Sequence, residues 1–206
     1  MKRKIFSRII VGVFLLLVLA ASICEKTQGD IASGVLRLHI VANSDDEADQ
    51  KIKLEVRDAI IEASKEIISD DNDKNLTNDE REKLVGVAEN VLRSKGADYD
   101  AVLMSGNYYF PTRQYENITL PAGNYDAIKV VLGEGKGQNW WCVMYPPLCF
   151  TQSALGAADE ESMKVLREGM SENCYELISE ENIKTVPAFK AVEIWQNLKE
   201  KVRNFL

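Results

Sequence analysis

The segment GKGQNWWCVMYPPLCF, residues 135–150, holds the residue types in this sequence that are best suited to chemistry. Cys142 or Cys149 could act as a nucleophile with the only histidine, His39, as its base, which is the arrangement of a Cys–His hydrolase. The same two cysteines flank a double proline and could instead close a short disulfide loop. A single histidine on a strand is more often a surface or hydrogen-bonded residue, so we expect no enzyme activity and no catalytic residues.

Metal and phosphate sites are not indicated by the sequence. It contains no Cys-x-x-Cys motif, and His39 lies about a hundred positions from the cysteine pair, which argues against zinc. The glycine-rich segment GEGKG, residues 133–137, lacks the Lys-Ser/Thr ending of a phosphate-binding loop. We therefore expect no metal, no cofactor and no small-molecule substrate.

The two tryptophans of residues 135–150 suggest a protein-binding surface. Trp140 and Trp141 are neighbours on a predicted strand, so their side chains point to opposite faces. The strand is expected to end at Pro146 and Pro147, because proline cannot donate to a strand ladder. An exposed tryptophan beside a rigid proline turn suits an interaction hot spot. Packing of both tryptophans in the core is the alternative.

The residues before this segment predict one strand followed by two helices. VLRLHIVA, residues 35–42, alternates in the manner of a strand, with Leu36, Leu38 and Ile40 on one face. Ser44 and Glu47 have capping-box spacing at the start of an amphipathic helix that runs to about residue 68. Thr77 and Glu80 repeat that spacing before a second helix, which is expected to stop at Gly96.

Four strand-like runs follow between Tyr99 and Tyr145, and helical periodicity returns near the C-terminus. The turns between these runs are short and cannot join parallel strands, which predicts an antiparallel β-meander. Helices are expected over residues 159–170 and 187–206. The predicted fold class is α+β, with an antiparallel β-meander packed against amphipathic helices.

The N-terminus has the pattern of an export segment. Four basic residues precede an uncharged apolar run from Ile9 to Cys24. That run suits the core of a signal peptide and is slightly shorter than a membrane span. Ala20 and Ser22 suit cleavage after Ser22, and retention as an uncleaved anchor is the alternative. We therefore predict a signal peptide or anchor over 1–24, a polar linker over 25–34, and one exported domain over 35–206.

The charge of the exported part argues against nucleic acid as a partner. The whole chain carries a net charge of −7. Without the four basic residues at the start, 21 basic residues face 32 acidic ones, which gives −11. Phosphate contacts need clustered Lys and Arg, so we expect the membrane to be contacted through the N-terminal segment only.

Three stretches resemble one known family. LRLHIVANSDDEADQKIKLEVRDAI, LPAGNYDAIKVVLGEGKGQNWWCVMYPPLCF and FKAVEIW are together similar to stage II sporulation protein R of endospore-forming bacteria. The resemblance covers nearly all of the chain after the export segment, and NWWCVMYPPLCF and LHIVANSD are its most specific parts. It adds no catalytic residues.

The resemblance implies a signalling protein that is made in the forespore and exported into the space between the two forespore membranes. There it would trigger a membrane-embedded aspartic protease of the mother cell, which cleaves the precursor of a sigma factor. Two other classes remain open, namely a secreted Cys–His hydrolase and a cell-wall-associated structural or binding protein. The partner-binding candidates are His39, Asn43, Trp140, Trp141, Pro146, Pro147 and Phe150, and the candidate disulfide joins Cys142 and Cys149.

Overall fold

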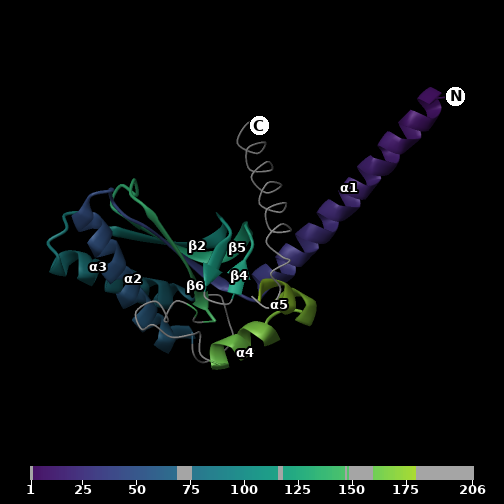
Figure 1. Ribbon diagram of the computed structural model, residues 1–206. Coiled ribbons are helices and arrows are strands. Elements are labelled where there is room, and N and C mark those ends of the chain that lie inside the picture. Colours follow the sequence, from purple (N-terminus) through teal and green to yellow (C-terminus); the bar gives the residue numbers. More distant parts are fainter. Residues whose placement is uncertain (1, 69–75, 116–117, 147, 149–159, 180–206) are drawn as a thin grey trace.

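Strand β1 (Leu36–Val41) lies at the centre of the fold, and all six of its residues are buried. The computed structural model describes residues 2–68, 76–115, 118–146, 148 and 160–179 (Figure 1). In this part of the chain β1 belongs to a four-stranded sheet of order β2-β5-β1-β6. The other members are β2 (Ala101–Phe110), β5 (Gly123–Leu132) and β6 (Asn139–Tyr145).

The sheet is mixed, so the prediction of an antiparallel meander was wrong. β1 runs parallel to β5 and antiparallel to β6, while β2 runs antiparallel to β5. The physical reason is that β1 is apolar or buried along its whole length and occupies the slot between β5 and β6. A meander would have paired β5 directly with β6. The α+β fold class is confirmed.

A short loop makes this arrangement possible by crossing the end of β1. Residues 133–138 connect β5 to β6, and Gly137 donates its backbone N–H to the carbonyl of Ala42. A Cβ atom on Gly137 would lie 2.1 Å from the backbone oxygen of Ser44. Gly133 and Gly135 have φ angles of 54° and 62°, which favour glycine. The glycines therefore permit the close crossing of two chain segments.

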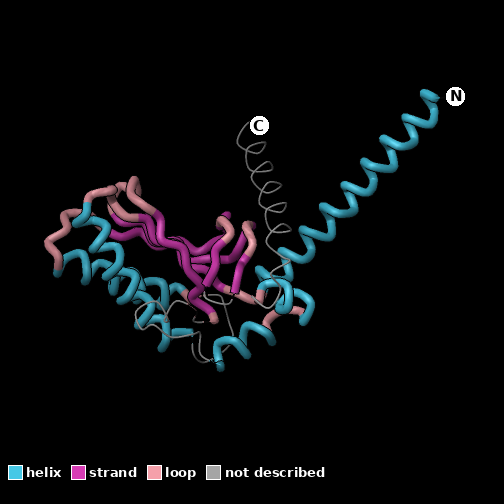
Figure 2. Tube along the Cα trace, viewed as in Figure 1, coloured by secondary structure: helices cyan, strands magenta, loops and turns pink. Residues whose placement is uncertain are grey.

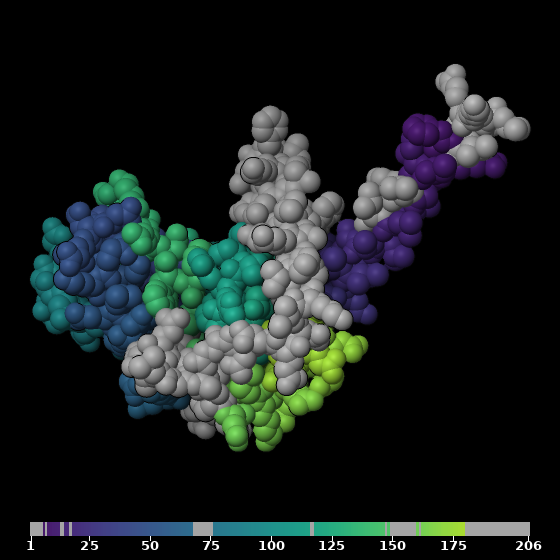
Figure 3. Space-filling model, viewed as in Figure 1, coloured from purple at the N-terminus to yellow at the C-terminus, as the bar shows by residue number. Residues whose placement is uncertain are grey.

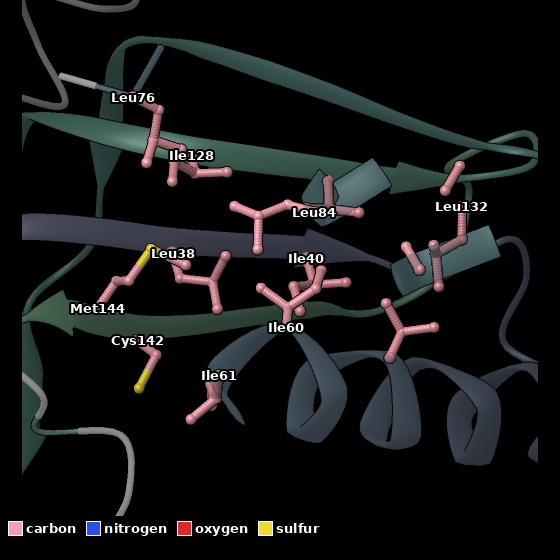
Figure 4. Packing of buried hydrophobic residues seen from close by; sticks show 14 of the residues in the cluster. Leu38, Ile40, Ile60, Ile61, Leu76, Leu84, Ile128, Leu132, Cys142 and Met144 are labelled. Atoms are coloured by element: carbon pink, nitrogen blue, oxygen red, sulfur yellow. The ribbon is translucent and has the colours of Figure 1, made fainter. Parts of the chain in front are cut away.

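Two helices cover one face of the sheet. α2 (Glu47–Ile68) and α3 (Asn78–Ser94) lie side by side beneath the strands (Figures 1 and 2). The predicted capping box at Thr77 and Glu80 forms, with both of its hydrogen bonds. The box predicted from Ser44 and Glu47 is not formed in the described structure. The Ser44 hydroxyl instead donates to Asp49 and accepts from the backbone N–H of Asp46. Apolar residues of both helices and of all four strands form the core on this face (Figure 4), including Leu38, Ile40, Ile60, Leu84, Ile128 and Cys142.

The opposite face is covered at one end by a second group of elements. These are the end of α1 (Lys2–Ser33), α4 (Glu160–Glu168), α5 (Glu172–Ile178) and the hairpin β3 (Arg113–Tyr115) with β4 (Ile118–Leu120). Their apolar residues form a second core with the sheet, including Ile31, Phe110, Tyr125, Val143, Leu166 and Ile178. The sheet therefore separates two cores.

α1 joins the domain only through its last turns. Its described apolar side chains between Phe6 and Ile23 are largely exposed, and the helix projects from the body of the protein (Figure 3). Residues 25–33, which were predicted as part of a linker, continue the helix, and Ile31 lies fully in the core. Gln28 also donates to the carbonyl of Asn124 at 2.8 Å. Among the described residues, no helix combines the length and the apolar content needed to cross a membrane.

Candidate functional site

Two of the predicted partner-binding residues meet on the face of the sheet opposite α2 and α3. The imidazole of His39 stacks on the indole of Trp141, with ring centroids 3.7 Å apart and an interplanar angle of 15°. Phe110 packs edge-on against Trp141 at 4.8 Å. They come together because β1 pairs with β6 in a register that puts His39 opposite Trp141. We call His39, Phe110 and Trp141 the aromatic cluster.

His39 is held neutral inside this cluster. It is 6% exposed, and burial lowers its pKa to about 4, with the positive charge of Lys129 acting in the same direction. A hydrogen bond of 2.7 Å between its Nε2 and Oδ1 of Asn139 opposes that change. A ring that is stacked, buried and uncharged near neutral pH has little surface to offer a partner protein.

Arg37 is fully buried. It precedes His39 by two residues on β1, so the two side chains lie on the same face of the sheet. Its Nε donates to the carbonyl of Cys142 at 2.9 Å, and an Nη donates to the hydroxyl of Tyr115 at 2.8 Å. The guanidinium also lies over the rings of Phe110 and Tyr125, at 4.3 and 4.9 Å. Within the described residues no carboxylate forms an ion pair with it, and one Nη has no hydrogen-bond partner.

Trp140 and Cys142 occupy the other face of β6, against the helices. The ring of Trp140 lies 4.5 Å from the guanidinium of Arg57 on α2. Trp140 and Trp141 therefore point to opposite faces, as predicted, but each is half-buried. Neither is the fully exposed anchor that the sequence suggested, and any contact with a partner would use only part of each ring.

The positions of His39 and Cys142 bear on the hydrolase alternative. Cys142 is 2% exposed in the core beside α2, whereas His39 lies on the opposite face of the sheet. Those two side chains cannot meet without refolding the sheet. Cys149 lies outside the described residues. Cys142 is disulfide-bonded, and among the described cysteines Cys24 and Cys174 are free.

Asn43 has a structural position at the end of β1. Its side-chain amide donates to Asp49 at 2.8 Å, and its side-chain oxygen accepts from the backbone of Glu134 at 2.9 Å. Asp49 also accepts from Ser44 and Tyr99, and the Ser44 hydrogen bond is the largest cause of its lowered pKa. Asn43 thus ties the start of α2 to the loop that crosses β1.

The proline turn is described only in part. Pro146 is buried, and the peptide bond between Tyr145 and Pro146 is cis. Pro147 and Phe150 lie outside the described residues. The structure therefore brings His39 and Trp141 together and leaves Trp140, Asn43 and Pro146 at separate positions.

Sequence reasoning missed the two polar residues that organise this region, Arg37 and Asp49. Arg37 interrupts an otherwise apolar strand, and such a residue signals either an exposed face or a buried charge with specific partners. Asp49 is one of several acidic residues near the start of α2. The sequence pattern alone does not reveal that the side chains of Asn43, Ser44 and Tyr99 all donate to the Asp49 carboxylate.

Comparison with known proteins gives one family. The family model described as stage II sporulation protein R matches residues 32–155. A protein of Bacillus subtilis (strain 168) called stage II sporulation protein R is 36% identical over 135 residues, which cover 64% of this chain. The match spans 60% of the length of that relative. No solved structure matches this chain.

Proposed function

The chain belongs to the stage II sporulation protein R family, and from that membership we propose that it is an exported intercellular signal of sporulation. In this proposal the chain leaves the forespore and enters the space between the two forespore membranes. There it binds a membrane-embedded aspartic protease of the mother cell, which then cleaves the precursor of a sigma factor. The family match over residues 32–155 is the observation that carries the proposal.

The arrangement of the candidate residues favours binding over catalysis. His39 is stacked, neutral and separated from Cys142 by the sheet. A Cys–His hydrolase built on these two residues would need them within hydrogen-bond reach on one face. No specific observation favours a structural protein of the cell wall, so the signalling role is the one that we develop.

The exposed part of α1 supports export. Large apolar side chains from Phe6 to Ile23 lie open to water, which is costly unless they are placed in a membrane or removed by cleavage. The folded body begins near Thr27, where the carbonyl accepts from Cys174. Cleavage after Ser22 would leave these contacts intact, and so would retention as an anchor.

Activation requires differential binding. A ligand switches a protease on only if it binds the active arrangement more tightly than the inactive one. Moving such an equilibrium from mostly inactive to mostly active takes about 5.5 kcal/mol. A few well-packed contacts at a protein interface can supply that difference. The chain would therefore act by stabilising one arrangement of the protease outside the membrane.

Complementation in cells tests this proposal. The chain, with the protease and precursor of its own source, would be expressed in a sporulating B. subtilis strain that lacks its own stage II sporulation protein R. We expect cleavage of the precursor to return, and to be lost when residues 1–24 are removed. Precursor that stays uncleaved although the exported chain is detected outside the cytoplasm would contradict the proposal.

A further inference from the structure

Within the part of the chain that the structure describes, strand β2 is an edge strand of the sheet and lacks the features that usually protect such an edge. Its only partner in the described sheet is β5. The strand is ten residues long and contains no proline and no charged residue. Val102 and Met104 are 54% and 38% exposed. Edge strands of soluble proteins are normally short, charged or covered, so this edge is suited to pairing with another strand.

A pocket opens beside the middle of the same strand. It has a volume of about 240 Å³ and lies on the side of the sheet that carries α3. Leu36, Leu76 and Ile128 supply apolar lining, and residues 105–107 of β2 also line the pocket. Figure 4 shows Leu76 beside Ile128 at this border of the helix-covered core. A strand added along β2 would place alternate side chains on this side of the sheet.

The pocket also contains a positive charge that forms no ion pair within the described residues. Arg81, in the first turn of α3, lines it, and the Nε of Arg81 is buried with no hydrogen-bond partner. Asp126 is the only carboxylate among the lining residues. Its Oδ1 accepts from Asn107 at 3.0 Å, and within the described residues it forms no ion pair with Arg81. A guanidinium with free donors is a preferred binding group for a carboxylate.

We propose that β2 and this pocket bind an extended segment of a partner protein, which pairs with the edge of β2 and places an aspartate or glutamate against Arg81. The mode is strand addition, in which main-chain hydrogen bonds give affinity and the pocket gives specificity. This proposal rests on the proposed function, since the partner is the part of the protease that lies outside the membrane. It places the docking surface away from Trp140 and Trp141.

A second copy of this chain fits the same edge less well. Residues 101–110 contain no aspartate or glutamate, so a second β2 would bring no carboxylate to Arg81. The exported part is also strongly acidic, which opposes self-association at low ionic strength. Self-pairing is nevertheless one outcome that the experiment must detect.

The test uses the full chain with the protease and its precursor reconstituted in vesicles. Met104→Lys places a charge on the edge, and Arg81→Gln removes the charge in the pocket. Ser94→Lys is the matched control, because it adds the same charge as Met104→Lys at an exposed position at the end of α3. Thermal unfolding checks that each variant is folded. A photoreactive side chain at position 104, with another at 94 as its control, identifies the neighbour.

We expect Met104→Lys and Arg81→Gln each to weaken protease binding and precursor cleavage by about tenfold or more, and Ser94→Lys to leave both unchanged. The photoreactive group at position 104 should attach to the protease. Normal binding and cleavage by the folded Met104→Lys variant would overturn the docking proposal alone, as would attachment only to a second copy. Failure of the unmodified chain to bind or stimulate the protease would instead contradict the proposed function.

Discussion

Arg37 places a positive charge inside the protein, where aromatic rings and two hydrogen bonds replace water. Its hydrogen bonds join β1 to β6 and to the β3–β4 hairpin, because they end on the carbonyl of Cys142 and the hydroxyl of Tyr115. The flat guanidinium can stack on Phe110 and donate in its own plane at the same time. Lysine has the same charge but lacks this geometry.

We therefore predict that Arg37→Lys lowers the free energy of unfolding by about 2 kcal/mol, since two hydrogen bonds and the stacking are lost or weakened. Arg113→Lys is the matched control, because Arg113 is exposed on β3, and it should change stability by less than about 0.5 kcal/mol. Urea unfolding of the three proteins at pH 7 measures both values. Equal stability of the Arg37→Lys variant and the natural chain would show that the buried geometry is unimportant.

His39 should make stability depend on pH. Its pKa is about 4 in the folded protein and about 6.5 when exposed, so the unfolded chain binds the proton more tightly. The stabilisation is thus complete above about pH 6.5 and is lost as the pH falls toward 4. We expect protonation of His39 to lower the free energy of unfolding by an amount on the order of 2–3 kcal/mol over that pH interval. In His39→Gln, which does not titrate, this component of the pH dependence should disappear from the urea midpoints. A variant that keeps the full slope would contradict the assignment.

At the scale of elements, the close crossing of the 133–138 loop over β1 determines the order of the strands. Gly137→Ala would force the new methyl group against the backbone of Ser44, 2.1 Å away. We predict a loss of stability of about 2 kcal/mol or more. Gly86→Ala is the control, because Gly86 lies within α3 with open space around it, and it should stabilise by about 0.5–1 kcal/mol. Thermal unfolding should show a lower melting temperature for Gly137→Ala and a higher one for Gly86→Ala. Equal melting temperatures of the two variants would mean that the loop does not pack closely against Ser44.

The elements themselves could be predicted from the sequence, but their pairing could not. α2 and α3 have apolar periodicity and β2, β5 and β6 have turns at their ends, so local patterns were sufficient. The position of β1 between β5 and β6 depends on partners about a hundred residues away, which no local pattern encodes. The alternation of β1 predicted its two faces correctly. It did not predict that the face with Arg37 and His39 would also be buried.

The candidate site was also predicted only in part, because some of its features are local and others depend on strand pairing. The sequence indicated that Trp140 and Trp141 point to opposite faces, because alternation is a local property of a strand. It did not indicate that His39 would stack on Trp141, which depends on the register between β1 and β6. The pocket beside β2 was missed because it combines Arg81 with a strand more than twenty positions away.

At the scale of the whole molecule, α1 has two distinct parts. The described side chains up to Ile23 belong to neither core, whereas Gln28, Asp30 and Ile31 contact the body of the protein. We predict that a chain of residues 25–206 unfolds at nearly the same temperature as the full chain. A chain of residues 35–206 should lose about 3 kcal/mol or more, because it lacks a buried isoleucine and several hydrogen bonds. Similar stability of the two shortened chains would show that α1 is not part of the domain.

We propose that this chain acts on the protease from outside the membrane. The most direct measurement adds the purified chain to the outer side of vesicles that contain the protease, with the precursor enclosed on the inner side. Cleavage of the precursor is then followed as the concentration of the chain rises. We expect cleavage to increase and to saturate, because a ligand that favours the active arrangement shifts the equilibrium until its site is filled. Cleavage that stays constant at every concentration, while the bound chain is detected on the vesicles, would contradict the account.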